Sequence, residues 1–247
     1  MSDWLVGRPL PTAGLRLLTF PHAGGGASAF ARWQSIAGAG AEVLRVQYPG
    51  RENLLDEEPL PCLDRLADRI TDAVRAIRDG RPLALFGHSM GALVAAEVAH
   101  RLQNDGCGAD LLVASGSLAP QVRAVQGSDP RGLSDQALLQ ELYDLGGTHV
   151  GVLADEELRE LVLPVARADL TAVFTYRYRH RTRLSCPITA WAGRDDADLD
   201  ASDIERWREI TTGEFRVNLA PGGHFFLWEA GRDILTDLTR SIEHAKV

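Results

Sequence analysis

Residues 82–100 read PLALFGHSMGALVAAEVAH, and this stretch decides the fold class. Pro82–Phe86 is a short, continuous apolar run, which is typical of a strand buried on both faces of a parallel sheet. The Ala-rich segment Met90–Leu102 predicts a helix. Between them, Gly87–Gly91 forms a Gly-x-Ser-x-Gly motif. The stretch therefore predicts a strand–turn–helix unit with a serine at the turn.

Strand-like and helix-like segments alternate on both sides of this unit. Cys62–Ile77, for example, carries apolar residues at steps of three and four, which is one face of a helix. Further helices are predicted at Ala201–Ile210 and Asp233–His244. Further strands are predicted at Leu15–Phe20, Glu42–Gln47, Leu111–Ser115, Ile188–Ala192 and Phe215–Leu219. This alternation predicts an α/β fold with a mostly parallel central sheet, flanked by helices through right-handed crossovers.

One region, residues 133–178, contains helical patterns and no convincing strand. Its predicted helices are Leu133–Leu145, Asp155–Leu163 and Arg167–Tyr176, with turn signals at Gly146–Gly147 and at Pro164. A helical insertion between two strands of such a sheet is most simply a cap over the carboxyl edge, where open α/β sheets bind ligands. We therefore expect a single domain over residues 1–247, with residues 133–178 as a helical lid.

Composition narrows the function classes. The chain has 247 residues, 45% of them hydrophobic, which excludes a disordered or fibrous protein. Its 26 Lys+Arg against 34 Asp+Glu give a net charge of -8, which speaks against binding to nucleic acid or an anionic membrane. Cys62, Cys107 and Cys186 lack metal-ligand spacing and cannot all pair, so we expect reduced thiols and no metal site. Without a signal peptide or an apolar membrane span, the expected compartment is the cytoplasm.

Ser89 is the candidate nucleophile. A Gly-x-Ser-x-Gly match alone is weak, but here it follows a strand and opens a helix, which is the setting of a nucleophile elbow. The two flanking glycines would allow strand and helix to approach closely, and the helix N-terminus would favour developing negative charge. The alternative is a Gly-rich turn with an incidental serine.

A serine nucleophile needs a base that is oriented by an acid. His224 lies in the Gly-rich loop PGGHFF after the last predicted strand and is the candidate base, whereas His88 is expected to pack beneath the elbow. Asp195 and Asp196 both follow the strand ITAWAG, so either could be the acid. A spacing of three residues from the glycine favours Asp196, and Asp195 would then be a capping or solvent-facing residue.

A second glycine-rich segment, PHAGGG at Pro21–Gly26, follows the first long predicted strand. It is not a P-loop, because no Lys-Ser/Thr pair follows at the required spacing. It does fit the second half of an oxyanion hole, with the amides of Ala23 and Met90 as the donors. The alternative is an ordinary Gly-rich turn.

With these segments placed, the chain resembles the stand-alone type II thioesterases of polyketide and nonribosomal peptide assembly lines. The resemblance rests on FPHAGGGASAF (20–30) with Trp33, QYPGRE (47–52), LFGHSMGALVAAEVA (85–99), SGSLAP (115–120), LPVARADL (163–170), CPITAWAGRDD (186–196) and PGGHFFLWE (221–229). It implies an α/β-hydrolase fold, a helical lid and a triad of Ser89, Asp196 and His224. Members of the family commonly have Pro after the second aspartate, whereas this chain has Ala197. The difference weakens the preference for Asp196 over Asp195 as the acid.

The resemblance also implies a substrate and a partner. The substrate would be an acyl group held as a thioester on the phosphopantetheine arm of an acyl or peptidyl carrier protein. The role would be editing, which removes stalled or wrongly primed acyl groups. No cofactor beyond the partner's arm is implied, and a monomer is expected.

An arginine-rich segment offers a possible contact with such a partner. Residues 176–183 read YRYRHRTR and concentrate four arginines just after the lid: Arg177, Arg179, Arg181 and Arg183. Carrier proteins are typically acidic, so this patch could bind one in spite of the acidic chain around it. The alternative is a solvated face without a partner.

Three other functions remain open at this point. A broad carboxyl esterase would use the same fold and triad, and an acyltransferase would pass the acyl group to an alcohol or amine instead of water. The third hypothesis is a non-catalytic binding module on a hydrolase scaffold. The presence of candidate nucleophile, base, acid and both donor loops speaks against it.

Overall fold

The computed structural model describes residues 2–122, 129–144 and 155–244. Within them, seven strands form one sheet in the order β1-β3-β2-β4-β5-β6-β7, and all neighbouring pairs are parallel except β1 with β3. The strands are β1 (Leu5–Val6), β2 (Leu15–Phe20), β3 (Ala41–Val46), β4 (Leu83–His88), β5 (Leu111–Ser115), β6 (Ile188–Gly193) and β7 (Phe215–Ala220). The six long strands lie within two residues of their predicted bounds. The edge strand β1 was not predicted, because two residues are too few to show a period.

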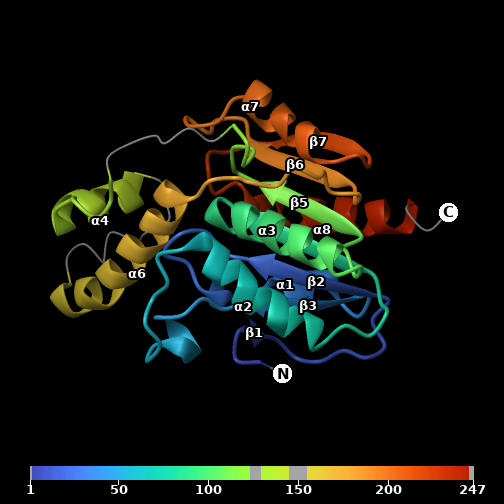
Figure 1. Ribbon diagram of the computed structural model, residues 1–247, viewed down its shortest axis with the longest axis horizontal. Helices are drawn as coiled ribbons and strands as arrows, with labels where there is room; N and C mark the ends of the chain where they lie inside the picture. Colours follow the sequence, from blue (N-terminus) through green and yellow to red (C-terminus); the bar gives the residue numbers. More distant parts are fainter. Residues whose placement is uncertain (1, 123–128, 145–154, 245–247) are drawn as a thin grey trace.

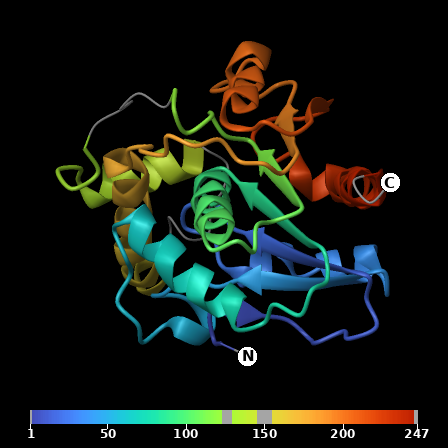
Figure 2. The same ribbon diagram turned by 45° about the vertical axis from the view of Figure 1, so that its right-hand side comes forward.

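Helices cover both faces of the sheet (Figures 1 and 2). On one face lie α2 (Leu63–Arg75) and α3 (Met90–Asn104), which pack against each other. On the other face lie α1 (Trp33–Ala37) and α8 (Leu227–His244). The remaining short elements are η1 (Ala27–Phe30), η2 (Glu52–Leu54), α7 (Ala201–Glu205) and η3 (Arg206–Ile210). The single helix predicted over Ala201–Ile210 is therefore divided into an α-helical and a 3-10 part.

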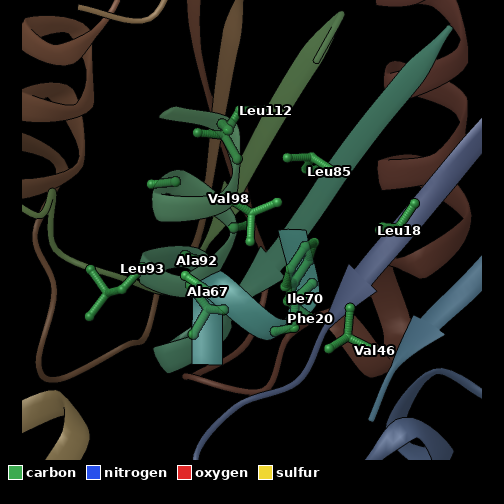
Figure 3. Close-up of a cluster of buried hydrophobic side chains, with 14 of the residues drawn as sticks. Leu18, Phe20, Val46, Ala67, Ile70, Leu85, Ala92, Leu93, Val98 and Leu112 are labelled. Carbon is green, nitrogen blue, oxygen red and sulfur yellow. The ribbon is translucent and has the colours of Figure 1, made fainter. Parts of the chain in front are cut away.

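Each face of the sheet has its own core. In register, Leu18 of β2 lies between Leu44 of β3 and Leu85 of β4, and all three are at most 1% exposed. The side chains of this first face fill the space between the sheet, α2 and α3 (Figure 3). They include Leu18, Phe20, Ile70, Leu85, Ala92, Val98 and Leu112. Side chains on the opposite face include Leu17, Trp33, Phe86, Val113 and Ile234. Burial on both faces explains the apolar runs of the central strands β4 and β5.

Two helices, α4 (Asp135–Asp144) and α6 (Glu156–Thr175), lie beside the carboxyl ends of the strands (Figure 1). The predicted break at Pro164 is wrong, because α6 continues through it. An internal proline removes one backbone hydrogen bond from the helix. The Asp155 carboxylate caps the amides of Glu157 and Leu158, and the second half of α6 is largely buried. The predicted turn at Gly146–Gly147 lies outside the described residues.

The sheet brings together loops that are far apart in sequence. The carboxyl ends of β2, β4, β6 and β7 all lie at one edge, since these strands are parallel. The loops after them contain all the predicted triad and oxyanion residues. The last helix, α8, begins at Leu227 rather than at the predicted Asp233, directly after the loop that holds His224. None of the helices in the described part of the chain has the length and apolar character needed to cross a bilayer.

Candidate active site

Ser89 occupies a strained turn between β4 and α3. Its φ of 54° and ψ of -120° are unusual for a non-glycine residue. Two backbone hydrogen bonds hold the turn: Ser89 N donates to Ser115 O at 2.8 Å, and Ala92 N donates to Ser89 O at 3.0 Å. The geometry is that of a nucleophile elbow, with a half-buried serine at the tip of the turn.

The glycines of the motif are required by close packing. A Cβ on Gly91 would lie 2.1 Å from the carbonyl oxygen of Phe20, and one on Gly87 would lie 2.1 Å from the carbonyl oxygen of Gly91. Both contacts are with backbone, which cannot move aside as a flexible side chain could. The two positions therefore let β2, β4 and the start of α3 approach closely enough to form the elbow.

His224 and Asp196 form a hydrogen-bonded pair. His224 Nδ1 lies 2.8 Å from Asp196 Oδ2, and the Asp196 residue is 9% exposed. The other carboxylate oxygen of Asp196 accepts from the amide of Asp198 at 3.1 Å. Asp195 instead accepts a hydrogen bond from the Gly222 amide at 3.2 Å. Of the two candidate acids, the carboxylate that contacts the histidine is therefore that of Asp196.

The imidazole of His224 lies close to the elbow. Its ring centroid is 5.0 Å from that of His88, the residue before Ser89, and a Cβ on Gly116 would lie 3.5 Å from its Cε1. Within the described residues, the Ser89 hydroxyl forms no hydrogen bond. Contacts between nucleophile and base are commonly long without substrate and shorten in the reacting complex.

Two further histidines, His22 and His88, surround this pair and are kept neutral by burial. His88 is fully buried beneath the elbow, where its Nδ1 lies 3.0 Å from Ser115 Oγ. Burial and the neighbouring His224 lower its pKa well below the ordinary value. The same two causes lower the pKa of His22 to about 4. Neither ring adds a positive charge near His224 at neutral pH.

The predicted oxyanion donors carry free backbone N–H groups. Met90 is the first residue of α3, so its amide has no partner inside the helix. The amides of Met90 and Ala23 donate no hydrogen bond within the described part of the chain. Both are therefore available to a ligand oxygen.

The glycine-rich loop that contains Ala23, residues 21–28, is held by side chains of the segment 47–52. Sequence reasoning did not assign these holding residues, although QYPGRE was one of the segments of the resemblance. The bonds are Tyr48 Oη to Pro21 O at 3.2 Å, Arg51 Nη1 to Gly25 O at 3.0 Å, Ala27 N to Gln47 Oε1 at 3.0 Å and Ser28 N to Glu52 Oε1 at 3.1 Å. Each one joins residues at least 20 positions apart, so no local pattern could reveal it.

The arginine-rich segment, residues 176–183, alternates between two sides. Tyr176 Oη donates to Glu97 Oε1 at 2.7 Å, and His180 Nε2 lies 2.9 Å from Glu97 Oε2 on α3. The four arginines at the intervening positions are all exposed: Arg177, Arg179, Arg181 and Arg183. The extended segment thus fixes itself to α3 with one side and presents a row of positive charge with the other.

Among the described residues, the remaining titratable groups form neither a disulfide nor a cluster of metal ligands. Cys62, Cys107 and Cys186 are unpaired, and burial raises the pKa of the Cys186 thiol to about 12. No group of three or more His, Cys, Asp or Glu side chains in residues 2–122, 129–144 and 155–244 is arranged to hold a metal ion.

Comparison with known proteins identifies the family. A family model described as "Thioesterase domain" matches residues 15–245. The chain belongs to the thioesterase family. It is 39% identical to a "Probable cadicidin biosynthesis thioesterase" of Streptomyces griseus over 234 residues, which cover 95% of this chain and 64% of that relative. It is 36% identical to the "Gramicidin S biosynthesis protein GrsT" of Aneurinibacillus migulanus, over 98% of this chain and 94% of that one.

A solved structure gives the same result. The thioesterase superposes on the type II thioesterase BorB from the borrelidin biosynthetic cluster with a TM-score of 0.89 and 39% identity, over 98% of this chain and 99% of that one. The resemblance to type II thioesterases is therefore confirmed, and so is the predicted α/β-hydrolase fold. This thioesterase is a serine hydrolase by family.

Proposed function

We propose that this thioesterase hydrolyses acyl groups from the phosphopantetheine arm of an acyl or peptidyl carrier protein. The observation that carries the proposal is the hydrogen bond between His224 and Asp196 beside the strained turn of Ser89. Next to this turn, the amides of Ala23 and Met90 donate no hydrogen bond among the described residues. The similarity to thioesterases of antibiotic biosynthesis supports the substrate class and an editing role.

In the acylation step, Ser89 Oγ attacks the thioester carbonyl while His224 Nε2 takes the hydroxyl proton. Asp196 holds Nδ1 of His224 and stabilises the imidazolium that forms. The carbonyl oxygen becomes an oxyanion, which accepts hydrogen bonds from the amides of Ala23 and Met90. The C–S bond then breaks, and His224 returns the proton to the thiolate of the arm. A thiol of pKa about 8.5 is a better leaving group than an amine.

In the deacylation step, water replaces the thiol. His224 removes a proton from the water, whose oxygen attacks the acyl-serine ester through a second oxyanion. Collapse of this intermediate breaks the ester C–O bond, and His224 protonates Ser89 Oγ. The products are a free carboxylic acid and the regenerated serine.

The test is hydrolysis of a short acyl group from a phosphopantetheinylated carrier protein, with wild type compared with Ser89→Ala. We expect release by wild type and loss of release in the variant. Equal, slow release by both would contradict the nucleophile assignment. Much faster cleavage of simple esters would indicate an esterase. Acyl products that form only with an added alcohol or amine would indicate an acyltransferase.

We further propose that the exposed arginines of residues 176–183 contact the acidic carrier protein. Their row begins directly after α6 and runs along α3 toward its C-terminal end, where His180 stacks on His100 and Gln103 donates to Arg183 O. Arg179 and Arg181 form no hydrogen bond or ion pair among the described residues, which leaves both charges available. An acidic partner would be attracted to this row despite the net charge of -8.

A further inference from the structure

A buried ion pair joins the lid segment to the loop segment 47–52. Arg51 Nη1 lies 2.6 Å from Asp169 Oδ2, and Arg51 Nη2 lies 2.9 Å from Asp169 Oδ1. Arg51 is 8% exposed and Asp169, on α6, is 1% exposed. The two parallel bonds form a bidentate pair, which is the strongest and most directional geometry for these groups.

The same two side chains also hold the glycine-rich loop. Asp169 Oδ2 accepts a hydrogen bond from the amide of Gly24 at 2.8 Å. Arg51 Nη1 donates to the carbonyl of Gly25 at 3.0 Å. The pair therefore fixes two consecutive glycines, and the first of them directly follows Ala23, the proposed oxyanion donor.

Other side chains hold the two ends of the loop, and a backbone hydrogen bond from Gly25 N to His22 O at 3.0 Å closes a turn around Ala23 and Gly24. Gln47 and Glu52 hold the far end of the loop at Ala27 and Ser28, and Tyr48 holds its start at Pro21. Between these anchors, the backbone of residues 24–26 is all glycine, with φ of 78° at Gly24. Glycine gains the most backbone freedom when a restraint is lost, so without the pair the turn around Ala23 and Gly24 would keep its backbone hydrogen bond but no side-chain restraint at the two glycines.

We propose that Asp169 and Arg51 are positioning residues that hold the Ala23 N–H toward the substrate oxygen in the transition state. The position of α6, through the carboxylate of Asp169, would thus determine whether the Ala23 N–H points into the oxyanion hole. The inference rests on the proposed function, because it assumes that Ala23 donates to the oxyanion. The competing interpretation is that the pair only fastens α6 to the body of the protein.

The experiment compares Asp169→Ala and Asp169→Asn with Asp135→Ala. Asp135, on α4, forms an ion pair at 2.7 Å with Arg167, which lies on α6 like Asp169, so the control removes an ion pair of α6 that does not contact the loop. The readouts are kcat and KM for a short acyl N-acetylcysteamine thioester, the inhibition constant of an alkylboronic acid and the Tm. A boronic acid that bonds to Ser89 places an anionic oxygen in the oxyanion hole, so its affinity reports on Ala23.

For folded Asp169→Ala we expect kcat to fall about 100-fold, near the loss for one oxyanion donor. KM should stay within about threefold, because the oxyanion exists only in the transition state. The inhibition constant should rise in parallel with the fall in kcat. Asp169→Asn keeps one acceptor oxygen for Gly24, so its loss should be smaller. Asp135→Ala should keep wild-type kcat.

A folded Asp169→Ala enzyme with wild-type kcat, or with reduced kcat but unchanged boronic acid affinity, would overturn the proposal. If this variant does not fold because Arg51 is left as an unpaired buried charge, Arg51→Met/Asp169→Leu removes both charges and provides the same test. Wild-type kcat in that double variant would also overturn it. Absence of thioester hydrolysis by wild type would instead contradict the proposed function.

Discussion

At the scale of single residues, two adjacent aspartates show how position decides chemistry. Asp196 accepts from His224, whereas Asp195 accepts from the backbone of Gly222. Asp196→Asn would leave an amide beside Nδ1 and favour the wrong tautomer of His224. We expect kcat for thioester hydrolysis to fall by about 1,000- to 10,000-fold.

The matched control is Asp195→Asn, one position away in the same loop. It keeps an acceptor oxygen for Gly222, so kcat should stay within a fewfold of wild type. Steady-state rates of both variants on the same acyl thioester check the assignment. A larger loss in Asp195→Asn than in Asp196→Asn would reverse the two roles.

At the scale of elements, a buried polar cluster joins α3 to the segment after α6. His100 stacks on His180 with ring centroids 3.8 Å apart, and its Nε2 lies 2.9 Å from Tyr178 Oη. Burial, with smaller contributions from His180 and Arg101 against an opposing one from Glu97, lowers the pKa of His100 to about 4. The folded protein therefore keeps this ring neutral where the unfolded chain, with a pKa of about 6.5, takes up a proton.

The sign of the pH effect follows from this difference. The stability that the neutral ring contributes is fully present above about pH 6.5 and is lost as pH falls toward about 4. In His100→Gln, the slope of the free energy of unfolding against pH should be smaller than in wild type, by up to about 1.4 kcal/mol per pH unit.

Urea denaturation between pH 6.5 and 4.5 measures this slope for wild type and variant. The window stops at 4.5 because the protonation of Glu97 adds its own pH dependence below that value. Burial raises the pKa of Glu97, but the interactions with His180, Tyr176 and Arg101 outweigh burial and lower this pKa to about 2. Equal slopes in the two proteins would show that His100 does not carry the effect.

At the scale of the whole molecule, charge distribution matters more than net charge. A chain of net charge -8 should repel an acidic carrier protein, unless the row of arginines at residues 176–183 acts locally. Arg179→Glu/Arg181→Glu should lower kcat/KM on an acyl carrier protein by about 10-fold or more at low salt, because association slows. Activity on a small acyl N-acetylcysteamine thioester should not change.

The control reverses two arginines elsewhere. Arg216→Glu/Arg232→Glu changes the net charge equally, but Arg216 lies on β7 and Arg232 on α8, on the face of the sheet opposite α3. This control should keep most of its kcat/KM and its salt dependence. If both double variants lost the same activity, net charge and not the row would be responsible.

Local sequence patterns were enough to predict most elements and the loops between them. Six strands and the helices α2 and α3 follow from apolar runs and periodicity, which are local properties. Once the strands were known to be parallel, the loops that contain Ala23, Ser89, Asp196 and His224 had to meet at one edge. The Gly-x-Ser-x-Gly motif identified Ser89 as the candidate nucleophile, because such a motif between a strand and a helix has few other uses.

The contacts between side chains became known only from the folded structure. It assigned the histidine contact to Asp196, continued α6 through Pro164 and added β1 at the sheet edge. It also showed Arg51 and Asp169, 118 positions apart, on the same glycine loop. A side chain's direction and a long-range hydrogen bond depend on how whole elements pack, and local sequence patterns do not contain that information.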